Sequence, residues 1–221
     1  MNPAIFTHPA EVYNRIAMLG LSQEHLVSIA VRMAQARTDC TANNPPSAPG
    51  FYAWSEGTRR ARELFIPLGW EACEYGQLSS IYNRKTGVRM IVINADAGAG
   101  LEDSQPQNRT YKRSATDRAV VENRENFLFD INLASNPQQP PCRINGAFNW
   151  YLFVFSYRDE VGDILRAELS LPSSITRGFF TSFHERIMVI SDEGFDEGSL
   201  IVPEDPEGDP EFEIHVTRKE A

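Results

Sequence analysis

The chain has 221 residues, of which 42% are hydrophobic and 23% charged, and its net charge at pH 7 is −9. These proportions are ordinary for a soluble globular domain and argue against a wholly disordered chain, and no apolar run is long enough to cross a bilayer. An acidic chain also lacks the overall positive charge that general nucleic-acid binding requires.

The first forty residues are expected to form two helices packed as a hairpin. Thr7 is a candidate N-cap, Pro9 suits the first helical turn, and Gly20 would end the first helix. The second helix is expected over residues 23–38, where apolar residues recur on one helical face. We therefore interpret residues 1–40 as a helical hairpin subdomain.

The segment 41–50 contains three prolines and a glycine, which cannot continue a helix. We interpret it as a proline-rich linker at a subdomain boundary. A third helix is expected from Ser55 to Ile66, because Ser55 can cap it and Pro67 would stop it. Residues 51–221 would then form an α+β domain.

From residue 78 onward the sequence shows patterns typical of strands. Two hairpins are expected, residues 78–83 with 88–94 and residues 150–157 with 164–171, each around a turn that contains glycine. Further strands are expected at 127–133, 186–191 and 212–216, and short helices at 114–124 and around Ile175, Phe179 and Phe183. The order of elements predicts an α+β fold: an N-terminal helical hairpin followed by a mostly antiparallel sheet with one or two inserted helices.

The negative charge is concentrated in residues 192–213, which contain ten carboxylates and no lysine or arginine. The other 199 residues contain 21 basic and 20 acidic residues, so they are nearly neutral. Because burial of unpaired carboxylates is costly, this acidic segment is expected to be a surface loop. Two interpretations of the loop stay open: it steers association with a basic partner, or it only increases solubility. The candidate partner-binding residues are Glu204, Asp205, Glu207 and Asp209.

The densest basic stretch is residues 109–118, at the start of the helix expected over 114–124. Basic side chains and a helix N-terminus both favour anions, and Tyr111 could stack on a base. Two other interpretations stay open: a solvated loop, or a loop that pairs with the acidic segment of the same chain. The candidate anion-binding residues are Arg109, Lys112, Arg113 and Arg118.

Two carboxylates on predicted strands, Asp130 and Glu168, are candidates for catalysis. Each is flanked by apolar residues, and two acids on neighbouring strands could hold a divalent metal for phosphodiester chemistry. A nuclease of the type with Glu-x-Lys would have lysine where this chain has Ser170. The alternation of the strands favours the simpler interpretation that both acids face solvent.

No complete catalytic motif is present, and neither a cofactor nor a metal is implied. The three cysteines are widely spaced, which predicts reduced thiols in a cytoplasmic protein rather than a disulfide framework or a zinc site. The leading hypothesis is a non-catalytic binding or regulatory protein that acts through its acidic surface on a basic protein. The alternatives are a metal-dependent enzyme acting on phosphate-containing substrates, and a nucleic-acid binder that uses residues 109–118.

Overall fold

The computed structural model describes residues 3–112, 114–129, 147–158 and 162–191. The helices are α1 (Pro9–Met18), α2 (Gln23–Thr38), α3 (Ala48–Phe65) and α4 (Ser114–Phe129), with short 3₁₀ turns at Ile66–Leu68 and Tyr75–Gln77. The strands are β1 (Ala4–Phe6), β2 (Glu71–Cys73), β3 (Ser80–Asn83), β4 (Val88–Asn94), β5 (Phe148–Arg158), β6 (Asp163–Thr176) and β7 (Phe179–Ile190). None of the described helices is long and apolar enough to cross a membrane.

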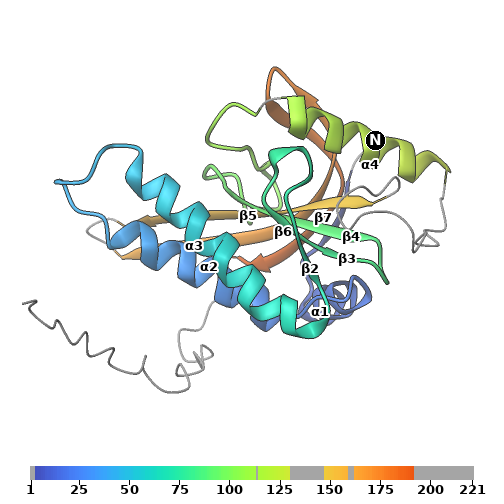
Figure 1. The fold of residues 1–221 in the computed structure, drawn as a ribbon, viewed down its shortest axis with the longest axis horizontal. Helices are drawn as coiled ribbons and strands as arrows, with labels where there is room; N and C mark the ends of the chain where they lie inside the picture. Colours follow the sequence, from blue (N-terminus) through green and yellow to red (C-terminus); the bar gives the residue numbers. More distant parts are fainter. Residues whose placement is uncertain (1–2, 113, 130–146, 159–161, 192–221) are drawn as a thin grey trace, which may run out of the picture.

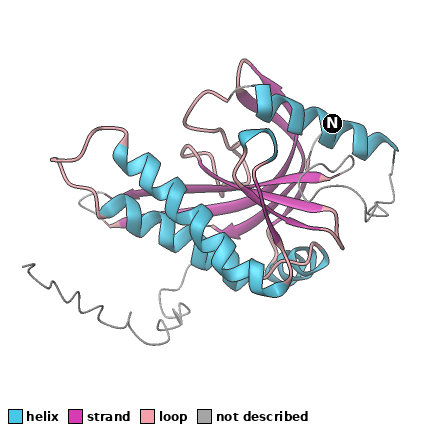
Figure 2. Ribbon diagram, in the orientation of Figure 1, coloured by secondary structure: helices cyan, strands magenta, loops and turns pink. Residues whose placement is uncertain are grey.

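The strands form one sheet in the order β1-β7-β6-β5-β4-β3-β2. Figure 1 shows α2 and α3 side by side, with α4 well apart from them beyond the strands. The same separation of helices around the sheet is visible in Figure 2, where strands are magenta. The molecule is therefore layered, with helices over the two faces of a central sheet.

The sheet is buried on both faces, and the sequence of β5 reflects this. Trp150 and Leu152 belong to a hydrophobic cluster with residues of α1, α2 and α3. Tyr151, Phe153 and Phe155 alternate with them and belong to a second cluster, on the side of α4. A continuous apolar run, rather than an alternating one, is what a strand covered on both faces requires.

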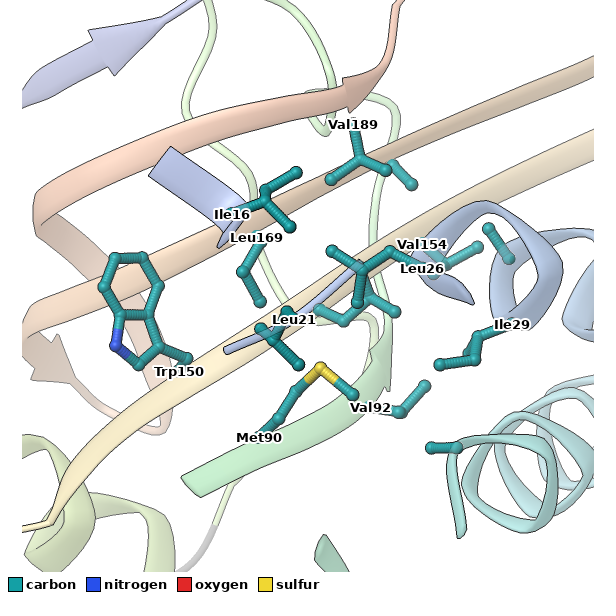
Figure 3. Close-up of a cluster of buried hydrophobic side chains, with 14 of the residues drawn as sticks. Ile16, Leu21, Leu26, Ile29, Met90, Val92, Trp150, Val154, Leu169 and Val189 are labelled. Carbon is teal, nitrogen blue, oxygen red and sulfur yellow. The ribbon is translucent and has the colours of Figure 1, made fainter. Parts of the chain in front are cut away.

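The first cluster joins helices and strands from distant parts of the chain. Figure 3 shows Ile16 of α1 beside Leu169 of β6, and Leu26 of α2 beside Val154 of β5. These four side chains are at most 1% exposed, and burying a large aliphatic side chain contributes about 1.5–3 kcal/mol. The cluster includes residues that precede and residues that follow the segment 41–50. The subdomain boundary proposed at this segment stays a prediction.

The fold is α+β, as predicted, but the sheet is mixed. β4 pairs parallel to β5 and β1 pairs parallel to β7, while the other four neighbouring pairs are antiparallel. A parallel pair needs a long crossover, and the chain between β4 and β5 contains α4. The sequence pattern indicated this helix but not the direction of the strand after it, and β1 was not expected at all.

The N-terminal helices exist as predicted, but their packing differs from a simple α1–α2 hairpin. The helix in most extensive contact with α2 is α3. Met33 of α2 packs so tightly on α3 that a Cβ on Gly57 would lie 2.5 Å from the Met33 Cγ, and Arg32 forms a salt bridge with Glu56. α3 also begins earlier than expected, at Ala48, because Pro49 fits the first turn of a helix.

Both predicted hairpins are confirmed, β3 with β4 and β5 with β6. Two other predictions are wrong. The expected strand 127–133 begins inside α4, which continues to Phe129, and residues 130–133 lie outside the described part. The expected helix around Phe179 is a tight turn between β6 and β7, where Arg177 and Gly178 have φ values of 49° and 73°. A four-residue spacing fits one strand face as well as a helix, and two positive φ angles are typical of two-residue hairpin turns.

Candidate anion-binding pocket

A cavity of about 510 Å³ lies where β4 ends, between α2, the start of α3 and residues 109–112 of the loop before α4. Ligand sites for small molecules are typically about 300–1,000 Å³ and often lie where several elements meet. A second cavity lies beside Arg89 and Glu122 and has a volume of about 10 Å³, room for one water molecule at most. The larger cavity is therefore the candidate site.

Three cationic side chains line the large cavity: Arg37, Arg109 and Lys112. None of the described residues that line it is acidic. Arg37 is held in place by two side chains, because its Nε donates to Ser156 Oγ at 3.0 Å and its Nη2 donates to Asn94 Oδ1 at 2.5 Å. These bonds fix the end of α2 to the ends of β4 and β5.

Arg109 and Lys112 are placed by backbone contacts of their loop. The Arg109 backbone N–H donates to the carbonyl of Asn94 at 3.3 Å, and the Lys112 backbone N–H donates to the carbonyl of Gly178 at 3.0 Å. The Arg109 guanidinium lies 6.0 Å from the centre of the Phe155 ring, at the outer limit of a cation–π contact. Neither cation forms a side-chain hydrogen bond or ion pair with any residue in the described part of the chain.

The electrostatics of the cavity favour an anion. Burial lowers the pKa of Lys112, because a partly buried ammonium loses hydration. Burial also lowers the pKa of Arg37, and the positive charge of Arg109 lowers it further. Like charges brought together without a countercharge cost free energy, and a bound anion would remove that cost.

The N-terminus of α3 adds to this positive potential. Ser47 is its N-cap residue and Pro49 and Gly50 are in its first turn, and all three line the cavity. The aligned peptide dipoles of a helix place a partial positive charge at this end. The start of α3 is anchored to β4, because Asn94 Nδ2 donates to the carbonyl of Gly50 at 2.8 Å.

Two aromatic residues of α3, Phe51 and Trp54, complete the wall of the cavity. Their ring centres lie 5.9 Å apart. Phe51 is 57% exposed although it is a large apolar side chain. The cavity therefore combines positive charge with flat apolar surface.

A buried ion pair anchors the loop that supplies Arg109 and Lys112. Glu168 and Arg186 are at most 1% exposed and lie 2.6 Å apart. Glu168 Oε2 accepts the backbone N–H of Gly100 at 2.9 Å, and Arg186 Nη2 donates to the carbonyl of Leu101 at 2.9 Å. The ion pair thus connects β6 to β7, and its hydrogen bonds connect both strands to the loop.

The close approach of the loop to the sheet requires glycine at position 100. Gly100 has a φ of +73°, and a Cβ there would lie 2.8 Å from the carbonyl oxygen of Ile190. A side chain at this position would be strained and would also clash with the backbone of β7. Gly100 therefore allows the loop to lie against β6 and β7 beside the ion pair.

The chain matches no known protein-family model, and no curated protein or solved structure is similar to it at a significant level. The geometry of the pocket is therefore the basis for assigning a function.

The structure places two of the four sequence-predicted anion-binding residues, Arg109 and Lys112, in the cavity. Arg118 is exposed on α4 and is not among the described lining residues, and Arg113 lies outside the described part. The candidate partner-binding residues Glu204, Asp205, Glu207 and Asp209 also lie outside it.

Of the two candidate catalytic carboxylates, only Glu168 lies in the described part of the chain. Asp130 lies outside the described part. The expectation that Glu168 faces solvent is wrong, because helices and loops cover both faces of the sheet and Arg186 pairs with it. No group of three or more His, Cys, Asp or Glu residues that could hold a metal occurs among the described residues.

Arg37 and the aromatic wall of the cavity were not predicted from the sequence. Arg37 is near the end of an ordinary amphipathic helix. Because it is far from residue 109 in the sequence, no local pattern indicated that the two residues line one cavity. The available signal was the segment from Pro46 to Trp54, in which aromatic residues follow directly on a proline-rich loop.

Proposed function

We propose that this protein binds a small multivalent anion, such as an organic phosphate, in the cavity lined by Arg37, Arg109 and Lys112. The observation that carries the proposal is the convergence of three cations on one cavity with no acidic residue among its described lining. Charge-assisted hydrogen bonds contribute about 1.5–3 kcal/mol each, more than bonds between neutral groups. A ligand with two or more negative charges would use this arrangement better than a monocarboxylate.

A charge placed at Gly50 tests the proposal without disturbing the fold. Gly50 lines the cavity, and a Cβ added to it would meet no atom within 4 Å. Gly50→Asp is expected to weaken pyrophosphate binding at least tenfold in titration calorimetry, because one repulsive charge contributes about 1.4 kcal/mol or more at such a site. An acidic residue in the first turn of a helix favours that helix, so the melting temperature should not fall.

The matched control is Gly50→Ala, which adds the Cβ without the charge. It should bind pyrophosphate as the wild type does, with equal or higher stability, because alanine favours a helix over glycine by about 0.5–1 kcal/mol. Equal pyrophosphate affinity in the Asp and Ala variants would contradict the proposal, as would the absence of binding to the wild-type chain.

The acidic segment 192–213 supports a second proposed function, association with a basic protein. Eight arginines of the described part already form salt bridges with carboxylates of the described part, so these eight are less available to neutralise the segment. The arginines that form these salt bridges are Arg15, Arg32, Arg59, Arg60, Arg62, Arg84, Arg158 and Arg186. The partner and the cytoplasmic location remain proposals.

Neutralising the candidate partner-binding residues tests this second proposal. With Glu204, Asp205, Glu207 and Asp209 replaced by their amides, association with a basic partner captured from the native cell should slow and depend less on salt. The reason is that charge concentrated in one segment mainly increases the rate at which the chain and an oppositely charged partner associate. If stopped-flow measurements show the same association rate and salt dependence for both chains, the acidic segment does not steer binding.

A further inference from the structure

We infer that the ligand of the cavity is a 5′-phosphorylated nucleoside, with its phosphate near Arg109 and Lys112 and its base against Phe51 and Trp54. The inference rests on the proposed anion-binding function and specifies its chemistry. Two features of the same cavity, cationic and aromatic, correspond to the two ends of such a molecule.

The charge of the cavity matches a phosphate monoester better than a carboxylate. A phosphate monoester carries a charge of about −1.5 to −2 at neutral pH and three strong acceptor oxygens. Lys112 offers three donors from a partly buried ammonium, and Arg109 offers a planar guanidinium. The N-terminus of α3, at Ser47 to Gly50, adds the partial positive charge that commonly accompanies phosphate sites.

The aromatic wall gives the cavity a surface for a flat ring. Phe51 is 57% exposed and lines the cavity together with Trp54. Both residues lie in the first two turns of α3, so the aromatic surface begins beside the phosphate-binding end of that helix. Stacking of a base on an aromatic side chain is tolerant of base identity, so the inference concerns nucleosides in general.

The base could belong to a free nucleotide or to the 5′ end of a single strand. Two other exposed aromatic residues lie beside Lys112 and outside the cavity lining: Tyr111 is 65% and Phe179 is 37% exposed, with ring centres 6.5 Å apart. Such residues are typical of surfaces on which successive bases stack. Both sources present the same phosphorylated nucleoside to the cavity, so the experiment must distinguish them.

The test compares ligands that share only one end of the nucleotide. Titration calorimetry would measure binding of AMP, ribose 5-phosphate and adenosine to the full chain and to the variants Phe51→Ala and Trp54→Ala. We expect AMP to bind about 5- to 150-fold more tightly than ribose 5-phosphate, the gain typical of one stacked base. Each aromatic variant should reduce that ratio while leaving the affinity for ribose 5-phosphate unchanged.

Phe51→Ala is expected to fold as the wild type does, because this side chain is largely exposed. A loss of binding in this variant would therefore not result from misfolding. Equal affinities for AMP and ribose 5-phosphate, or a ratio unaffected by the aromatic variants, would overturn the inference and leave the proposed anion-binding function standing. No binding of ribose 5-phosphate, AMP or pyrophosphate would overturn both.

A short oligonucleotide separates the two sources of the ligand. A 5′-phosphorylated strand that binds more tightly than AMP would support the inference and identify a strand end as the source. A phosphorylated strand that binds no more tightly than AMP would support it with a free nucleotide as the source. If the same strand without its 5′ phosphate bound equally well, recognition of the phosphorylated end would be excluded and the inference overturned.

Discussion

Replacement of Glu168 by glutamine is expected to lower the free energy of unfolding by about 3–5 kcal/mol, because it leaves the Arg186 guanidinium buried without a countercharge. For a chain of this size, such a loss corresponds to a fall in melting temperature of about 6–20 °C. Glutamine keeps one acceptor, but it cannot engage Arg186, Gly100 and Ser170 as the carboxylate does. Differential scanning calorimetry measures the change directly.

Arg158→Gln is the matched control for this prediction. Arg158 also pairs with a carboxylate across two strands, that of Asp163, but both side chains are more than half exposed. Exposed ion pairs contribute little to stability, so this variant should have the same melting temperature as the wild type. Equal melting temperatures for Glu168→Gln and Arg158→Gln would show that the buried pair does not hold the loop and the sheet together.

Replacement of Lys112 by methionine is expected to weaken pyrophosphate binding about 10- to 150-fold, the loss of one charge-assisted hydrogen bond. The same change should leave the melting temperature unchanged or raise it. Lys112 is partly buried and its ammonium has no ion-pair partner in the described part of the chain, so methionine removes a cost of desolvation. Loss of affinity together with preserved stability distinguishes a binding residue from a structural one.

Lys85→Met provides the control for the change in net charge. Lys85 is exposed in the turn between β3 and β4, at the end of β4 opposite to the cavity. Its replacement should leave both the affinity for pyrophosphate and the melting temperature unchanged. If Lys85→Met and Lys112→Met weaken pyrophosphate binding equally, binding depends on overall charge and not on the cavity.

The hairpins could be predicted from the sequence because their signals are local. The turn that ends at Gly87 connects two short apolar runs, and the turn at Gly162 does the same for β5 and β6. The basic stretch at Arg109 and Lys112 was also visible, since the two residues are three positions apart. Local spacing and turn chemistry are properties that a short window of sequence contains.

The buried ion pair and the full set of cavity residues could not be predicted, because they depend on contacts between residues that are far apart in the sequence. Glu168 and Arg186 are 18 residues apart, and only the pairing of β6 with β7 makes them neighbours. Alternation along β6 predicted a solvent-facing carboxylate because it could not indicate that the sheet is covered on both sides. Arg37 joins Arg109 in the same way, through the packing of α2 against the ends of β4 and β5.

The pKa of Lys112 is the most direct measure of the central claim, that the cavity is an anion site. In the ligand-free protein, burial holds this pKa below its ordinary value of 10.5. A bound anion stabilises the protonated ammonium, so the pKa should rise on addition of pyrophosphate, and affinity should fall as pH rises through the ligand-free pKa. NMR titration of lysine-labelled protein, assigned with Lys112→Met, would show this rise. A Lys112 pKa that is the same with and without saturating pyrophosphate would contradict the account.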